Sequence, residues 1–417
     1  MNRFLMLALV LLLAAAPLTA ATLRNDDSCD VAQMPAATLL LPYFEVSLGD
    51  RATARTTLVS VTNTSREPQI AKVTIWTDWG FPVIDWNIYL TGYDVAALDL
   101  RDVLDGHIVP TSTSSPRGTR SLSANPRFLS NAAGACGANG QPTVIPPSLA
   151  ADVIASLTVG GNSHCPDQKI GSTHAADRAS GYVTIDVVAT CSTTLPTDGT
   201  YINELLYDNV LTGDSIIYDA NPQTGNYAGS SPLVHIRAIP EGGNAGVRTA
   251  TNLPMTFYGR YMPSAAPKAD RRQPLPSRFA ARWMDGGASG FNTDFMIWRG
   301  VNVASCSSAQ QAGHNLPFDV VTFDSRENPT TFTTQSLPTL DATNRVSMSK
   351  MPAAFSGDTV GWIYLDLDVT PQAEPAQNWV VVAQTAEGRY MAAYDATALG
   401  NGCSPRVSKT APIAPAP

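Results

Sequence analysis

The chain has 417 residues, which is enough for two domains of ordinary size. Charged residues make up 15% of it, against roughly 25% in an average soluble domain, and the formal net charge is −8. An acidic chain with no basic patch argues against a nucleic-acid partner.

The first 21 residues have the pattern of an export signal. Arg3 gives a positive start, residues 4–18 form an apolar core, and residues 19–21 form a small-residue cleavage site. The apolar core is too short for a comfortable membrane span. We therefore expect an exported protein, periplasmic or extracellular, whose mature form has no membrane span.

Strand patterns begin soon after this signal. Residues 37–48 form an apolar run, and residues 57–63 form a β-branched run that ends in a turn. Residues 71–78 alternate apolar and polar side chains, which is the period of a strand with one buried face. Residues 98–101 alternate again. The pattern predicts antiparallel strands joined by short polar turns, as in a β-sandwich.

The middle of the chain loses this pattern and then regains it. Residues 106–179 are rich in Ser, Thr, Gly, Asn and Pro, which predicts a long irregular insertion in the first domain. Residues 181–191 alternate cleanly. A Gly-rich run at 241–246 is the best candidate for the domain boundary, and the Pro-rich run at 263–276 is a second one. The further predicted strands are 216–219, 233–239, 278–283, 294–299, 318–323, 361–369 and 379–384.

These elements predict an all-β protein of two immunoglobulin-like antiparallel β-sandwich domains. The domains are expected at residues 22–240 and 241–407, with a flexible Pro/Ala tail at 408–417. Two internal similarities suggest that the domains are related. Residues 361–368 echo 181–188, and residues 293–298 echo 57–62.

Six cysteines lie in the mature part, and an even number in an exported chain favours disulfides. The pairing expected from their positions is Cys29–Cys191, Cys136–Cys165 and Cys306–Cys403. The alternative is a zinc site that uses Cys136, His164, Cys165 and His174, but the spacing is irregular and no C-x-x-C occurs.

Several short motifs resemble a group of exported bacterial proteins of unknown function. They are LPYFEV at 41–46, WTDW at 76–79, YLTGYD at 89–94 and DLRD at 99–102. The resemblance covers roughly the first hundred mature residues. It implies a bacterial origin and export, and it carries over no catalytic residue.

An aromatic cluster is the main candidate binding site. An exposed Trp beside carboxylates and amides can hold a sugar, whereas the same rings can instead fill the space between two sheets. The candidate ligand-binding residues are Trp76, Asp78, Trp79, Trp86, Tyr89 and Tyr93.

Other motifs are read as structural. The block 213–216 is similar to the nucleophile block of G-D-S-L esterases but lacks a late Asp-x-x-His, and 287–290 fails the G-x-S-x-G pattern, so both are read as turns. Asp366 and Asp368 are read as a solvated face, and the histidines show no metal spacing. Loop calcium is left open for the carboxylates Asp94, Asp99, Asp102 and Asp105, and no other cofactor is expected.

The sequence thus favours an exported, non-enzymatic structural or binding protein whose partners are glycans or another envelope protein. The alternatives are a carbohydrate-binding protein with an aromatic platform and a hydrolase whose site is assembled from distant residues. The oligomeric state is left open.

Overall fold

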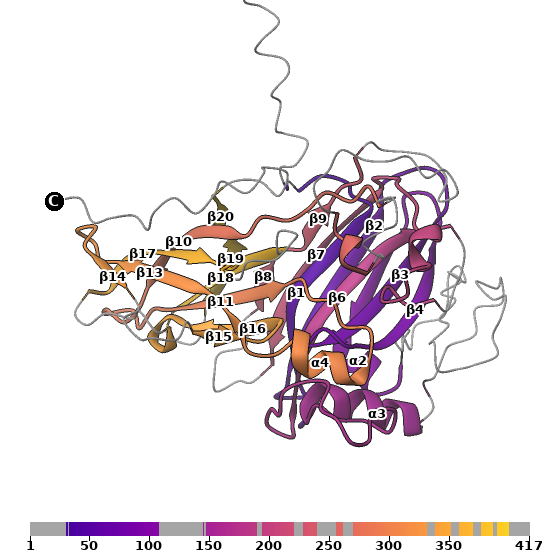
Figure 1. Cartoon of the computed structure of the whole chain (residues 1–417), viewed down its shortest axis with the longest axis horizontal. Coiled ribbons are helices and arrows are strands. Elements are labelled where there is room, and N and C mark those ends of the chain that lie inside the picture. The colour runs from indigo at the N-terminus through magenta and orange to yellow at the C-terminus, as the bar shows by residue number, and fades with distance from the viewer. Residues whose placement is uncertain are drawn as a thin grey trace, which may run out of the picture.

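The chain folds into two antiparallel β-sandwiches that lie against each other (Figure 1). The computed structural model describes residues 31, 33–107, 145, 147–189, 194–220, 228–239, 256–261, 270–331, 338–351, 358–369, 377–386 and 390–399. The prediction of an all-β sandwich fold is confirmed, while the immunoglobulin-like assignment stays a prediction.

The first sandwich contains nine strands in two sheets. They are β1 (Thr38–Ser47), β2 (Arg55–Asn63), β3 (Gln69–Thr77), β4 (Pro82–Leu90), β5 (Val95–Asp99), β6 (Arg178–Val188), β7 (Leu211–Asp219), β8 (Ala228–Ser231) and β9 (Val234–Ile236). Sheet A1 has the order β4-β3-β6-β1-β9, and sheet B1 has the order β5-β2-β7-β8.

The second sandwich also has a five-stranded and a four-stranded sheet. Its strands are β10 (Arg278–Met284), β11 (Asn292–Arg299), β13 (Asp319–Phe323), β14 (Pro329–Thr331), β16 (Thr343–Ser347), β17 (Val360–Asp366), β18 (Asn378–Ala386), β19 (Tyr390–Asp395) and β20 (Thr397–Ala398). Sheet A2 has the order β14-β13-β17-β10-β20, and sheet B2 has the order β16-β11-β18-β19. The short strands β12 (Leu316–Pro317) and β15 (Thr339–Leu340) form a separate ribbon.

Few helices complete the described part of the chain. The α-helices are α2 (Leu100–Leu104), α3 (Pro147–Thr158) and α4 (Cys306–Ala312), and the 3-10 helices are Tyr201–Asn203, Gly259–Tyr261 and Met348–Lys350. None of these helices is long and apolar enough to cross a membrane.

The two sandwiches have the same topology. When β12 and β15 are set aside, the strands of the second sandwich take the same places in the same chain order as those of the first. β6 and β17 each lie at the centre of a five-stranded sheet, and β2 and β11 each lie second in a four-stranded sheet. The two sequence echoes fall on these two pairs of strands, so topology and sequence agree on an internal repeat.

Two glycines show that the repeat extends to individual contacts. Gly181 of β6 pairs with Phe44, and Gly361 of β17 pairs with Trp283. A Cβ atom on Gly181 would lie 2.1 Å from the Trp76 carbonyl oxygen, and one on Gly361 would lie 2.0 Å from that of Phe323. Both positions therefore need glycine for the same close approach of neighbouring strands.

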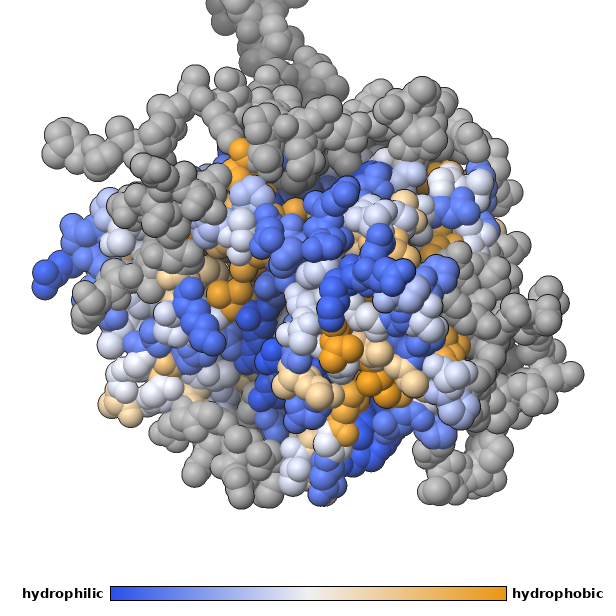
Figure 2. Space-filling view, turned by 60° about the horizontal axis from the view of Figure 1, so that its bottom comes forward, coloured by the Kyte–Doolittle hydropathy of each residue, from blue (hydrophilic) through white to orange (hydrophobic). Residues whose placement is uncertain are grey.

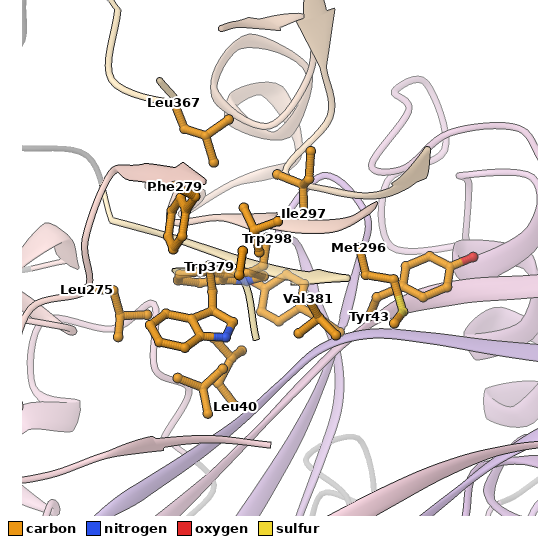
Figure 3. Close-up of a cluster of buried hydrophobic side chains, with 14 of the residues drawn as sticks. Leu40, Tyr43, Leu275, Phe279, Met296, Ile297, Trp298, Leu367, Trp379 and Val381 are labelled. Carbon is orange, nitrogen blue, oxygen red and sulfur yellow. The ribbon is translucent and has the colours of Figure 1, made fainter. Parts of the chain in front are cut away.

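Sheet A1 is buried on both faces. One face of β1, β3 and β6 packs on sheet B1 and forms the core of the first sandwich, with members such as Leu39, Val73 and Val183. The opposite face carries Leu40 and Tyr43 into a second cluster that continues through the second sandwich (Figure 3). Antiparallel sheets usually leave one face in water, so the continuous burial of β1 marks contact on both sides.

Sheet B2 supplies the other side of this contact. Strand β1 lies next to β11, β16 and β18, while β10 of sheet A2 lies next to β11 and β18 from the opposite side. The sheets therefore follow one another face to face as B1, A1, B2 and A2, and at one edge β19 of B2 also lies next to β8 of B1. We call the contact between A1 and B2, together with residues 256–261 and 270–276 that pack into it, the seam.

The structure corrects several local predictions. Strands β2 and β3 lie in different sheets and do not form a hairpin, and β4 is absent from the predicted strands. Leu100 begins α2 and does not continue a strand. The block 213–216 lies inside β7 and is not a turn, whereas 287–290 is a turn.

The expected irregular insertion at 106–179 is partly helical. Residues 147–158 form α3, which packs on the first sandwich through Val153 and Leu157. The export signal, the 241–246 boundary and the tail from 408 lie outside the described residues.

Candidate functional site

The six residues proposed to bind sugars are not gathered on one exposed surface. Trp76 is 0% exposed and lies in the seam, where its ring stacks on Tyr182 at 5.4 Å between ring centres. Its indole nitrogen donates to Thr184 at 2.9 Å. The period-two pattern places Trp76 correctly on the face opposite Ile75, but the second sandwich covers that face.

The other candidate residues separate from Trp76. Trp86 is buried in the core of the first sandwich, and Trp79 is buried in a small cluster beside α4. Tyr89 is half-buried in β4. Tyr93 lies in a turn with φ of 57° and is 71% exposed. These rings therefore do not form an aromatic platform. Packing between sheets accounts for Trp76 and Trp86, and packing beside α4 accounts for Trp79.

Asp78 belongs to a polar cluster at one end of the seam. Its Oδ1 accepts a hydrogen bond from the Ser172 backbone at 2.9 Å, and its Oδ2 lies 3.0 Å from His174 Nε2. Ser180 Oγ lies 2.9 Å from the same Nε2 atom. A hydrolase triad needs the acid and the nucleophile on opposite nitrogens of the ring, so this group is not arranged as one.

A second Ser, His and Asp group lies beside the first and joins the two sandwiches. Ser172 of the first sandwich donates to Asp341 at 2.5 Å, and His314 Nδ1 lies 2.5 Å from the other oxygen of Asp341. Trp79 Nε1 donates to Ser172 at 2.9 Å and its ring packs on His314. The carboxylate stands between serine and histidine, so the histidine is not placed to take the serine proton.

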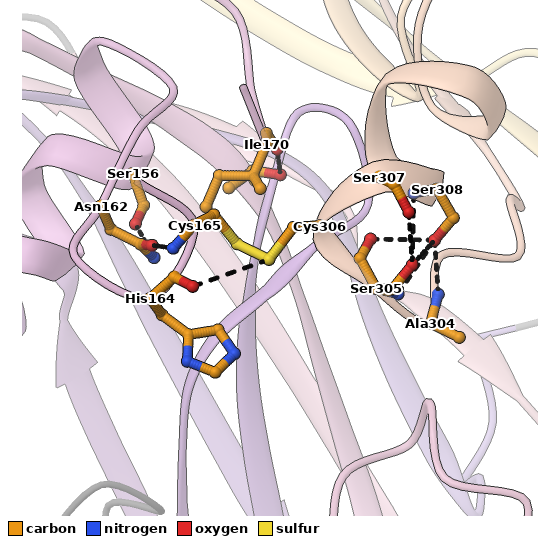
Figure 4. Close-up of a disulfide and its surroundings, with 11 residues drawn as sticks. Ser156, Asn162, His164, Cys165, Ile170, Ala304, Ser305, Cys306, Ser307 and Ser308 are labelled. Carbon is orange, nitrogen blue, oxygen red and sulfur yellow. Dashed lines mark hydrogen bonds between the residues drawn. A yellow bond between two sulfur atoms is a disulfide. The ribbon is translucent and has the colours of Figure 1, made fainter. Parts of the chain in front are cut away.

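A disulfide links the sandwiches at the same end (Figure 4). Cys165, after α3, is bonded to Cys306 at the start of α4, with a sequence separation of 141 residues. Ser305 caps α4 through a capping box with Ser308, which fixes the position of Cys306. Figure 2 looks toward this end of the molecule, where hydrophilic residues surround smaller groups of hydrophobic ones.

This bond corrects the predicted pairing. Cys136–Cys165 and Cys306–Cys403 are wrong, because Cys165 and Cys306 are bonded to each other. The zinc alternative is also wrong for the oxidised protein, since Cys165 is not a thiolate. Cys29, Cys191, Cys136 and Cys403 lie outside the described residues.

A buried charge network lies farther along the seam, and little in the sequence indicates it. Asp186 accepts from Thr38 at 2.5 Å, from Tyr201 at 2.8 Å and from Tyr258 at 2.6 Å. The Arg272 guanidinium lies 3.7 Å from Asp186, and neither side chain is exposed. The pKa of both Tyr201 and Tyr258 is raised well above the ordinary value of a phenol, chiefly by burial and then by the nearby Asp186 carboxylate. Both phenols stay protonated and donate to the carboxylate.

Ion pairs also line the edge of the seam. Arg55 pairs with Glu45 at 2.8 Å, and Arg345 of β16 lies 3.7 Å from Glu45 and 2.7 Å from Asp294. Burial alone would raise the pKa of Glu45, but Arg55 and Arg345 together hold it below its ordinary value. The carboxylate therefore stays ionised between two guanidinium groups from different sandwiches.

The carboxylates left open for calcium have protein partners. Asp102 and Asp105 pair with Arg51, and Asp99 caps α2 by accepting from the Arg101 backbone. In the described ranges, no group of three or more His, Cys, Asp or Glu residues is placed to hold a metal.

Two other candidate motifs are packed into the structure. Ser215 of the G-D-S-I block is buried in β7. Asp366 is not on a solvated face, since it is buried at the end of β17 and bonded to Arg278 at 3.1 Å.

Comparison with known proteins gives no match: no family model, no curated protein and no solved structure is significantly similar to this chain.

Proposed function

We propose that this is an exported, non-enzymatic protein with a structural or binding role in the bacterial envelope or outside the cell. The disulfide Cys165–Cys306 carries the proposal, because it joins the two sandwiches and such bonds persist in oxidising compartments. The export pattern of residues 1–21 points to the same compartments.

The polar groups of the seam support the non-enzymatic part. Ser172 holds one sandwich to the other by donating to Asp341, while His174 and His314 each pair with a carboxylate of their own sandwich. The hydrogen bonds of these groups do not follow the order of a nucleophile, base and acid. These contacts stabilise the packing of the two sandwiches and the loops beside them.

Expression in a bacterium with the native leader tests the export. We expect a mature N-terminus after residue 21 and a peptide map in which Cys165 and Cys306 are linked. A cytoplasmic protein with an intact leader and free thiols would contradict the proposal.

A separate assay tests the absence of catalysis. We expect no labelling by a fluorophosphonate probe and no hydrolysis that Ser172→Ala or Ser180→Ala abolishes. Labelling of either serine, or of Ser215, would favour the hydrolase alternative.

A further inference from the structure

Among the described residues, the repeat leaves two sheet faces uncovered, and these correspond to the two faces joined in the seam. Within the chain, the outer face of A1 meets the outer face of B2. The outer faces of A2 and B1 turn away from this contact, so they lie at opposite ends of the order B1, A1, B2 and A2.

Both uncovered faces carry apolar side chains together with a few polar ones. On A2, Val360 is 42% exposed, and Phe323, Trp362 and Tyr364 are half-buried beside it. On B1 the exposed residues are Leu58, Val95, Ala97, Asp214, Ile216 and Tyr218. The patterns of β2, β7 and β17 alternate, as expected of sheets with one face in water.

An aromatic pair at the centre of A1 recurs on A2. Trp76 pairs with Tyr182 across β3 and β6, and their rings stack with 6° between planes. Phe323 pairs with Trp362 across β13 and β17, and their rings also stack with 6° between planes. The first pair is buried by Trp298 of B2, which packs on Tyr182. The second pair has no such cover among the described residues.

The strand registers show which residues would meet if the seam were repeated between molecules. In the seam, Tyr43 of A1 lies with Met296 and Val381 of B2 in one cluster (Figure 3). Phe44 is the strand partner of Gly181, and Trp283 is the strand partner of the equivalent Gly361. Tyr43 precedes Phe44 and Arg282 precedes Trp283, so Arg282 takes the place of Tyr43 on A2.

The corresponding places on B1 follow from β2 and β7. Strand β2 pairs with β5 over 58–62, and β11 pairs with β16 over 294–298. Ser60 and Met296 each lie in the middle of these ranges and therefore correspond to each other. Their strand partners on the other side, Asp214 of β7 and Val381 of β18, correspond as well. Arg282 and Asp214 are both exposed, and neither has an ion-pair partner in the part of the chain that the structure describes.

We propose that the outer face of A2 binds the outer face of B1 of a second copy of this chain, with Arg282 of one copy facing Asp214 of the next. Aromatic and aliphatic groups flank this charge pair on both faces, and interfaces between soluble partners combine such groups with complementary charges. A contact between two different faces is heterologous, so each copy keeps one free face of each kind and can add a further copy. The inference deepens the proposed structural role and rests on it.

Sedimentation velocity of the mature, oxidised protein from about 1 μM to about 1 mM tests the association. We expect an open series of species that grows with concentration. Arg282→Glu and Asp214→Arg should each weaken self-association roughly tenfold or more, because each places like charges face to face. An equimolar mixture of the two variants should associate again, because the glutamate introduced in one variant meets the arginine introduced in the other.

Val159→Glu is the matched control. Val159 is 38% exposed, which is close to Val360, and it lies after α3 on neither face. The control should associate like the unchanged protein, whereas Val360→Glu should not.

Three results would overturn the proposal. They are a monomer at every concentration, a closed dimer that needs A2 but not Asp214, and two charge variants that fail to associate when mixed while circular dichroism shows both folded. None of these results bears on export, which leader cleavage and the disulfide map measure independently.

Discussion

Asp186 and Asp366 occupy equivalent positions in the two sandwiches but are expected to contribute differently to stability. Both lie at the same register, opposite Thr38 in β1 and opposite Arg278 in β10. Asp186 is sealed in the seam with Arg272, whereas the Arg278 side chain that pairs with Asp366 is 37% exposed. The carboxylate in the seam is therefore expected to matter far more for stability.

The first prediction compares these two positions. Asp186→Asn should lower the free energy of unfolding by about 3 to 5 kcal/mol, because it removes one of the two carboxylates that face the buried Arg272 guanidinium. Asp366→Asn should cost about 1 kcal/mol or less, as is typical of a pair near water. Urea unfolding of both variants measures the difference. Equal losses would contradict the burial of the network.

A second prediction concerns pH. The pKa of Glu45 in the folded protein lies below its ordinary value of 4.5, so folding favours the ionised form. The stability from this carboxylate is fully present above about pH 4.5 and is lost as the pH falls through the lower folded pKa. Glu45→Gln should cost about 1 to 3 kcal/mol at neutral pH and progressively less in acid.

The control for this pH profile is Glu67→Gln. Glu67 forms an exposed pair with Arg66 and should change little at any pH. A Glu45→Gln loss that is the same at pH 3 and pH 7 would show that the effect does not come from ionisation.

The period of two locates Trp76 correctly on the polar face of its strand, but it cannot say what covers that face. Lys72 and Thr74 on the same face suggest solvent, yet both are buried. Trp76 is covered by the ring of Tyr261, and the Lys72 ammonium lies over the ring of Tyr201, both more than a hundred positions later in the chain. Local periodicity carries no information on such distant packing.

At the scale of elements, the sequence does carry a sign of the seam. The run LLL in β1, VVV in β18 and FMIW in β11 are continuous apolar stretches, which are typical of strands buried on both faces. By contrast, β2 and β7 alternate because their sheet has one face in water. This criterion identifies β1, β11 and β18, but it misses β3 and β6, whose alternating sequences are also buried on both faces.

Strand pairing and the helices are harder to predict. β2 and β3 are neighbours in sequence but cross from B1 to A1, and a turn signal does not distinguish a hairpin from such a crossing. Helix α3 has only 12 residues, and small residues separate its apolar positions Leu149, Val153 and Leu157, so its helical periodicity spans few turns. Disulfide pairing depends on which loops meet in space, and the meeting of the α3 loop with α4 follows only from the seam.

The third prediction concerns this bond. The double variant Cys165→Ser, Cys306→Ser should lose about 2 to 5 kcal/mol, because the bond closes a long loop in the unfolded chain. Calorimetry of the oxidised proteins gives the change. Peptide mapping that links Cys165 to Cys136 would contradict the assignment.

For the whole molecule, the repeat and the seam together explain why the aromatic residues are buried. A duplicated sandwich presents two sheet faces per copy, and joining one face of each copy requires apolar side chains there. The two halves share a topology but differ in sequence at places where one half is covered and the other is not. Met296 and Val381 in the seam against Ser60 and Asp214 on B1 are an example.

Differential scanning calorimetry of the mature, oxidised protein tests most directly that the seam joins the two sandwiches into one unit. We expect a single transition whose calorimetric and van't Hoff enthalpies agree. Trp298→Ala removes a large buried side chain from the centre of the seam. This variant should show two unfolding transitions in place of one. Trp86→Ala, in the core of the first sandwich alone, serves as the control for losing a buried indole. Two independent transitions in the unchanged protein, with Trp298→Ala leaving both in place, would contradict the seam.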